Sequence, residues 1–327
     1  MTLSNDEVPN VAQPMGVANA APFGSGPAGS NNIRQVVLGP EGLRSGWGFA
    51  LYLALVFALM MVARLLLRPA MHRLKGSVWQ FLAQELILVT CALLPALAMA
   101  FIEKRPFGSY GLPGRKAFGA AFWLGLVWGF AALSILLVAL RGSHAFFFGP
   151  VGVHGLQAVK FGAFWALLFL LVAFFEEFLF RGYSLFTLSR NVGFWPMAVA
   201  LSALFGGVHL GNPGESWRGA LAAGLIGLFF CFTLRRTGNL WFAVGLHASW
   251  DWAESYFYGV PDSGTMVQGH LLNPSFHGPA WLTGGTVGPE GSVLVFVVIA
   301  ALFAAFHFTH PSPQAELGSG DSELLAA

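Results

Sequence analysis

The sequence predicts an all-α fold, a polytopic helical bundle in a membrane. Of its 327 residues, 56% are hydrophobic and only 10% are charged, whereas a soluble globular domain carries about 25% charged residues. The mean hydropathy is +0.66. The apolar residues form long continuous runs, which are typical of membrane helices and unlike the short alternating strands of a membrane barrel.

About eight apolar segments are expected to be transmembrane helices, because each approaches the ~20 residues that span a bilayer. They lie at roughly 47–67, 78–102, 117–140, 161–187, 193–211, 217–234, 238–258 and 291–309. Together they predict a transmembrane domain over residues 46–310. Residues 1–45 are rich in Gly, Pro, Ala, Ser and Asn and lack a signal-peptide pattern, so they predict a disordered tail. Residues 311–327 predict a short polar tail.

The basic residues predict the orientation of the chain. Loops on the side of both termini hold ten Lys and Arg residues, against seven on the other side, so both termini are expected to be cytoplasmic. A basic patch after the first segment argues the other way. We expect a multi-pass protein of a bacterial-type cytoplasmic membrane. The net charge of +2 does not indicate a nucleic-acid partner. Cys91 and Cys231 lie in apolar runs and predict no disulfide framework.

Three charged residues lie at the end of the fourth segment: Glu176, Glu177 and Arg181. A charge at the centre of a membrane helix costs roughly 2.5–3.5 kcal/mol on insertion scales, so such groups indicate a functional site. Glu177 and Arg181 have i,i+4 spacing and can neutralise each other on one helix face. Glu176 is turned about 100° from Glu177 and needs a different partner.

Two further polar motifs lie in later segments. The fifth contains Phe205 and His209, and the seventh contains His247 and Asp251. Both pairs have i,i+4 spacing and share a helix face. The helical rise places Glu176, His247 and His209 at depths of ~16, ~14 and ~22 Å from the same membrane surface. We therefore expect an active site buried among the fourth, fifth and seventh helices.

Each motif also has a purely structural interpretation: an ion cluster ending a helix, a satisfied histidine, or a hydrogen bond between packed helices. Their occurrence together in three membrane segments favours a shared site. Nearby glycines are expected to let the helix backbones approach closely. They are Gly206, Gly207, Gly211, Gly224, Gly227 and Gly245.

The three motifs, in this order, resemble the CPBP family, which comprises CAAX prenyl proteases and bacteriocin-processing enzymes and is also called the Abi family. The resemblance covers about residues 100–258. It rests on Glu176-Glu177-x-x-x-Arg181, Phe205-x-x-x-His209 and His247-x-x-x-Asp251. The turn from Arg105 to Leu112 is also similar to a stretch that often precedes the family core.

The resemblance implies an intramembrane endopeptidase. It implies that Glu176 activates the attacking water, that His209 works with Glu176, and that Glu177 and Arg181 form a supporting ion pair. His247 and the residue four positions later would hold the oxyanion. Here that residue is aspartate, and an ionised carboxylate only accepts hydrogen bonds. We therefore expect Asp251 to orient His247 and leave His247 as the donor.

The expected partners are the bilayer and a protein or peptide substrate that is membrane-associated or prenylated. No cofactor is required by this scheme; the alternative is a zinc site formed by Glu176, His209 and His247. The sequence contains no Gly-x-Ser-x-Gly elbow, no candidate Cys-His dyad and no His-Glu-x-x-His. Two other functions stay open: an ion-coupled transporter, which would favour inverted repeats that the sequence lacks, and a non-proteolytic membrane scaffold or immunity protein.

Overall fold

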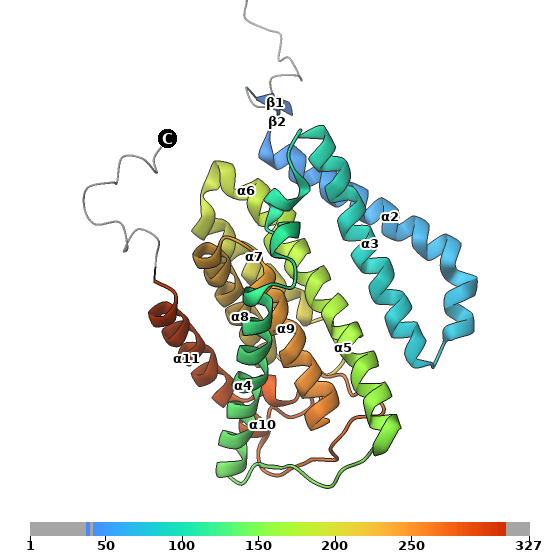
Figure 1. Cartoon of the computed structure of the whole chain (residues 1–327), viewed down its shortest axis with the longest axis vertical. Helices are drawn as coiled ribbons and strands as arrows, with labels where there is room; N and C mark the ends of the chain where they lie inside the picture. The colour runs from blue at the N-terminus through green and yellow to red at the C-terminus, as the bar shows by residue number, and fades with distance from the viewer. Residues whose placement is uncertain (1–36, 40–41, 312–327) are drawn as a thin grey trace, which may run out of the picture.

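The computed structural model describes residues 37–39 and 42–311, and there the chain forms a bundle of helices (Figure 1). Most of both predicted tails lies outside the described residues. The α-helices are α2 (Ser45–Leu74), α3 (Val78–Ile102), α4 (Ala120–Gly142), α5 (Gly155–Glu177), α6 (Ser184–Val192), α7 (Phe194–His209), α8 (Trp217–Thr237), α9 (Trp241–Trp252), α10 (Ala280–Thr283) and α11 (Val293–Thr309). Two π-helical turns are η3 (Phe178–Tyr183) and η4 (Ala253–Tyr258), and the short 3₁₀ turns are η1 (Phe107–Tyr110), η2 (Gly114–Lys116) and η5 (Pro289–Gly291). Two small antiparallel pairs join β1 (Leu38–Gly39) to β2 (Gly42–Leu43) and β3 (Phe146–Phe147) to β4 (Ser275–Phe276).

The protein is an integral membrane protein with five helices that are long and apolar enough to span a bilayer in the described part of the chain. They are 45–74, 78–102, 120–142, 155–192 and 217–237. Backbone groups in hydrocarbon must be satisfied internally, which is why these runs fold as helices. The other three predicted segments are also largely helical, but α7 and α11 have only 16 and 17 residues. Eight crossings therefore stay a prediction.

Helix α9 lies at the centre of the bundle and packs against α4, α5 and α8. The α2–α3 hairpin lies beyond α5 on one side, and α11 covers α4 and α8 on the other (Figure 1). One close approach of α9 and α4 involves Gly245, where an added Cβ would collide with the carbonyl oxygen of Phe122. The predicted role of Gly245 in close helix packing is therefore confirmed. Gly207 differs, because a Cβ there would meet open space.

The segment between η4 and α11 is more than a connection. It folds back onto the bundle, where Phe276 pairs with Phe146 in the β3–β4 ladder. The Leu271 amide donates to the Tyr256 carbonyl at 2.7 Å, and the Asn273 amide donates to the Pro150 carbonyl at 2.9 Å. Phe146 is fully buried. The segment thus closes one end of the bundle and supplies side chains to its interior.

The basic turn before α4 packs against η3 and α6. Glu103 accepts from the Tyr183 hydroxyl at 2.6 Å and pairs with Arg190 at 2.8 Å. The ring of Phe107 stacks on Phe178 with centroids 5.4 Å apart. These contacts tie the turn to η3, the segment that follows the paired glutamates.

Candidate active site

The helix that carries the paired glutamates changes its hydrogen-bond pattern directly after them. α5 ends at Glu177 and continues as the π-helical turn η3. Gly182 leaves helical geometry, with φ −80° and ψ −117°, and a Cβ there would lie 2.7 Å from the Phe178 ring. Such π turns are rare and occur frequently at functional sites. A continuous helix over residues 161–187 is the prediction that this turn interrupts.

Glu177 and Arg181 form the expected ion pair beneath the site. Arg181 Nη1 lies 3.0 Å from Glu177 Oε1, and both side chains are fully buried. The guanidinium carbon lies 4.1 Å from the centroid of the Phe205 ring, a cation–π contact that is stronger away from water. The arginine is thus held between a carboxylate and an aromatic face.

Gly227 of α8 makes room for this arginine. A Cβ at Gly227 would collide with Arg181 Nη2 and lie 3.2 Å from Phe205. We expect Gly227→Ala to lower the free energy of unfolding by about 1–3 kcal/mol, as overpacking does in well-packed cores. Gly207→Ala is the matched control, because its methyl group enters open space and should be neutral or slightly stabilising. Equal melting temperatures for the two variants in detergent would contradict the close contact.

His247 contacts three carboxylates of the site. Its Nδ1 lies 3.1 Å from Glu177 Oε1, and its Nε2 lies 3.4 Å from Asp251 Oδ2 and 3.7 Å from Glu176 Oε2. The ring stacks on Phe230 at a centroid distance of 5.5 Å. Each ring nitrogen faces a carboxylate oxygen, which only accepts hydrogen bonds. Both nitrogens can donate at once only when both carry hydrogen.

These contacts add a partner of His247 that was not expected. Asp251, expected to orient His247 and leave it as the donor, does face Nε2. Glu177 holds Nδ1 from a different helix. Glu177 therefore links the Arg181 ion pair to the orientation of His247.

His209 has a defined tautomer. Its Nδ1 lies 2.7 Å from the carbonyl oxygen of Phe205, and a carbonyl only accepts, so Nδ1 carries the hydrogen. Nε2 of the neutral ring is then left with its lone pair. The Phe205 ring meets the imidazole edge-on at 4.6 Å, so Phe205 positions both His209 and Arg181.

Residues of all three motifs line one cavity of about 320 Å³. Its lining includes Glu176, His209, His247 and Asp251, together with the ring of Phe205. Glu177 and Arg181 lie outside the lining and contact it through His247 and Phe205. The volume lies within the range of small-molecule pockets, about 300–1,000 Å³. The structure therefore brings the residues of the fourth, fifth and seventh predicted segments to one hollow.

The same cavity has polar residues that the sequence analysis missed. Glu85 of α3 lines it, as do Asp262 and Glu290 from the folded-back segment. Glu85 was detectable in principle as a single acid within an apolar run. Asp262 and Glu290 carry no such signal, because they lie in a stretch without helical periodicity.

Zinc requires ligand atoms that converge. Among the described residues, the group that brings three ligand atoms within 4.8 Å of one another is Glu254, Asp262 and Glu290. Glu176, His209 and His247 do not form such a group as they lie, and His247 Nδ1 already faces Glu177. The residues expected to hold zinc therefore do not fit a zinc site in this arrangement.

Comparison with known proteins identifies one matching segment. Residues 158–253 match a family model described as type II CAAX prenyl endopeptidase Rce1-like. The segment begins in α5 and ends after α9, so it contains all three motifs, whereas Glu85, Asp262 and Glu290 of the cavity lining lie outside it. No curated protein and no solved structure matches the chain.

Proposed function

We propose that the chain is a CAAX-type protease of the CPBP family, an intramembrane endopeptidase that uses a water activated by Glu176 and His209, because residues 158–253 match the type II CAAX prenyl endopeptidase Rce1-like model. The observation that supports this most directly is the shared cavity, whose lining holds Glu176, His209, His247 and Asp251. A carboxylate, two imidazoles and room for a peptide are the parts that general acid–base hydrolysis needs.

Glu176 is the proposed general base. Its side chain is 24% exposed, into a cavity that also holds His209. The carboxylate takes a proton from water, the water oxygen attacks the scissile carbonyl carbon, and Glu176 returns the proton to the leaving amine as the C–N bond breaks. The lone pair on His209 Nε2 can accept a second hydrogen of the same water and hold it in line.

His247 is the proposed donor to the oxyanion. Its Nε2 points toward Glu176 and Asp251, where the reacting carbonyl would lie. A donor stabilises the transition state most when it is already fixed in place. Glu177 at Nδ1 and the Phe230 ring against the imidazole face supply that fixation. The developing oxyanion would compete with Asp251 for the Nε2 hydrogen.

The substrate is proposed to be a protein or peptide associated with the bilayer. Beside the polar groups, the cavity is lined by apolar side chains of α5 and α8, including Leu168, Val172 and Ile226. This wall suits an apolar segment or a prenyl chain next to the cleaved bond. We also propose a bacterial-type cytoplasmic membrane with cytoplasmic termini, on the charge distribution described above.

The experiment that tests the activity is cleavage of a peptide library by purified protein in detergent, with the products identified by mass spectrometry. Glu176→Ala protein prepared in parallel is the control. We expect a defined set of products from the native protein and their absence with the variant. Identical product lists from both preparations would contradict proteolysis at this site.

Metal removal tests the proposed water activation. We expect protein stripped with a zinc-selective chelator such as 1,10-phenanthroline, and verified zinc-free by elemental analysis, to retain its hydrolytic activity. The reason is that His247 Nδ1 is engaged by Glu177 and the three expected ligands do not converge. The metal-free scheme is wrong if active protein contains one zinc per chain, loses activity when the zinc is removed, and regains activity when zinc is added.

A further inference from the structure

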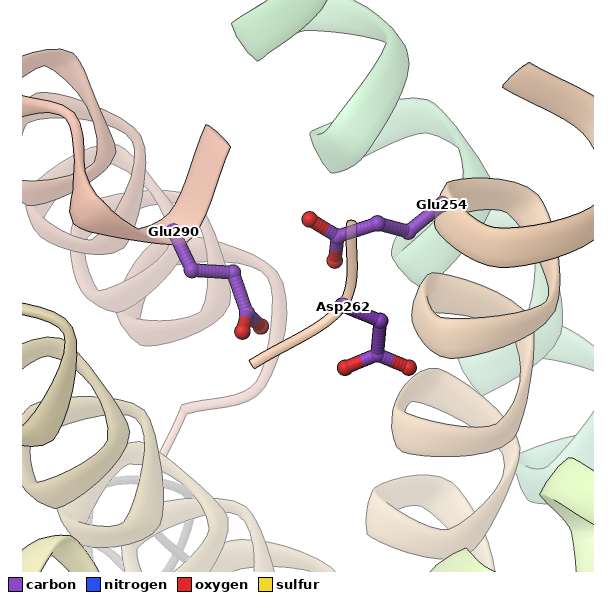
Figure 2. Close-up of side chains that lie close together, drawn as sticks. All are labelled: Glu254, Asp262 and Glu290. Carbon is purple, nitrogen blue, oxygen red and sulfur yellow. The ribbon is translucent and has the colours of Figure 1, made fainter. Parts of the chain in front are cut away.

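Three carboxylates meet at the end of the bundle where the segment after η4 folds back. Glu254 comes from η4, Asp262 from the turn that follows it, and Glu290 from η5 (Figure 2). One oxygen of each lies within 4.8 Å of the others. Figure 2 shows that the three side chains lie close together and come from three separate segments.

Glu254 has a buried carboxylate without a partner in residues 37–39 and 42–311, which indicates a missing ligand. Its side chain is fully buried, and neither carboxylate oxygen has a hydrogen-bond partner among the described residues. Burying an ionised carboxylate without a partner is strongly unfavourable. The ion pairs found in the described part of the chain give no Lys or Arg to Glu254, Asp262 or Glu290.

The other two carboxylates are already oriented. Glu290 Oε1 accepts from Trp250 Nε1 at 3.0 Å, and its Oε2 accepts from the Ser263 hydroxyl at 2.9 Å. Asp262 Oδ2 accepts from the Ser255 hydroxyl at 3.3 Å. Two oriented carboxylates thus lie beside a buried carboxylate that has no hydrogen-bond partner among the described residues. A bound cation would balance the negative charge of the three groups.

We propose that Glu254, Asp262 and Glu290 bind a hard divalent cation, with Ca²⁺ as the best fit. All the donors are carboxylate oxygens, which suit Ca²⁺, Mg²⁺ or Mn²⁺ better than zinc or copper. Mg²⁺ keeps several waters and is usually bound through one or two carboxylates, whereas Ca²⁺ takes about six to eight oxygen ligands in flexible geometry. Three carboxylate oxygens that lie within 4.8 Å of one another therefore suit Ca²⁺ better.

The cation would act as a clamp for the wall of the cavity. Asp262 and Glu290 both line the cavity, and Trp250, which donates to Glu290, immediately precedes Asp251. A cation that joins η4, the following turn and η5 would hold the folded-back segment against the end of α9. This inference does not depend on the proposed proteolysis, because binding can be measured without substrate.

Terbium luminescence tests the site in the intact protein. Tb³⁺ takes oxygen ligands as Ca²⁺ does, and the Trp250 indole beside Glu290 would sensitise its emission. We expect emission that saturates at one Tb³⁺ per chain and is displaced by Ca²⁺. Glu254→Gln and Asp262→Asn should each weaken binding by at least about tenfold, since the number of ligand charges sets the affinity. Glu215→Gln, outside this cluster, and Glu176→Gln, in the main cavity, should bind as the native protein does.

Thermal melting with and without Ca²⁺ gives an independent measurement. Ca²⁺ should raise the melting temperature of the native protein and of Glu215→Gln, and should leave that of Glu254→Gln unchanged. The proposal is overturned if the native protein shows neither saturable sensitised emission nor a Ca²⁺-dependent melting shift, which would indicate carboxyl groups that share protons. It is also overturned if Glu176→Gln loses binding while Glu254→Gln and Asp262→Asn keep it.

Discussion

Replacing Glu176 by glutamine is expected to lower the rate of peptide hydrolysis by about 10²–10⁴, the usual loss when a general base is removed. Glutamine keeps the size and shape of the side chain but cannot take a proton. The protein should remain folded, because Glu176 is 24% exposed to the cavity and its shortest charged contact, to His247 Nε2, is as long as 3.7 Å. The turnover rate on a cleaved library peptide is the measurement, with the melting temperature recorded alongside.

Glu215→Gln is the control for the loss of one carboxylate elsewhere. Glu215 accepts from the Ser216 amide at 2.7 Å and does not line the cavity. Its variant should hydrolyse the peptide at the native rate. Near-native turnover by Glu176→Gln would remove Glu176 from the role of base. An unfolded Glu176→Gln would give that residue a structural role that its exposure does not suggest.

The parts of this site that local spacing controls could be predicted from the sequence. An i,i+4 pair on a helix shares a face wherever that helix lies, so the Glu177–Arg181 ion pair and the Phe205–His209 contact followed from helical geometry. The convergence of three motifs followed from their similar depths, and His247 and Glu176 do lie 3.7 Å apart. Membrane helices favour this kind of argument, because their axes are nearly parallel and their lengths are fixed by the bilayer.

Contacts between helices could not be predicted from spacing. Only Asp251, one turn away, was expected to orient His247, because no local pattern shows that Glu177 of α5 reaches across to His247 Nδ1 on α9. The π turn at η3 also escaped prediction. In this turn the Phe178 ring lies 2.7 Å from where a Cβ at Gly182 would be, and that contact becomes visible only once the chain is folded.

The contribution of the folded-back segment to the cavity was not predicted, for a different reason. Its Gly and Pro content predicts turns, and turns have no periodicity from which to derive a buried face. Two of its carboxylates nevertheless enter the cavity. Glu254 was more accessible to prediction, because it lies three residues after Asp251 in an apolar helix and so shares its face. A complete search for acids within apolar segments would have found both Glu254 and Glu85.

Replacing Arg181 by alanine is expected to lower the free energy of unfolding by about 3–5 kcal/mol, the cost of leaving one member of a buried ion pair alone. Both members are fully buried, and Glu177 would keep a charge with only His247 as partner. The melting temperature and the yield in detergent should fall together with activity. The matched control is Arg190→Ala, whose pair with Glu103 is 24% exposed on the arginine side and should matter less, because solvent screens exposed pairs.

A double variant separates stability from positioning. Glu177→Gln with Arg181→Met removes both charges and should recover part of the lost stability, since no uncompensated charge remains. Activity should stay low, because Glu177 Oε1 is the contact that fixes His247 Nδ1 and a glutamine oxygen holds an imidazolium less tightly. Arg181→Ala protein that is inactive yet melts at the native temperature would contradict this assignment and would place Arg181 in direct contact with the substrate.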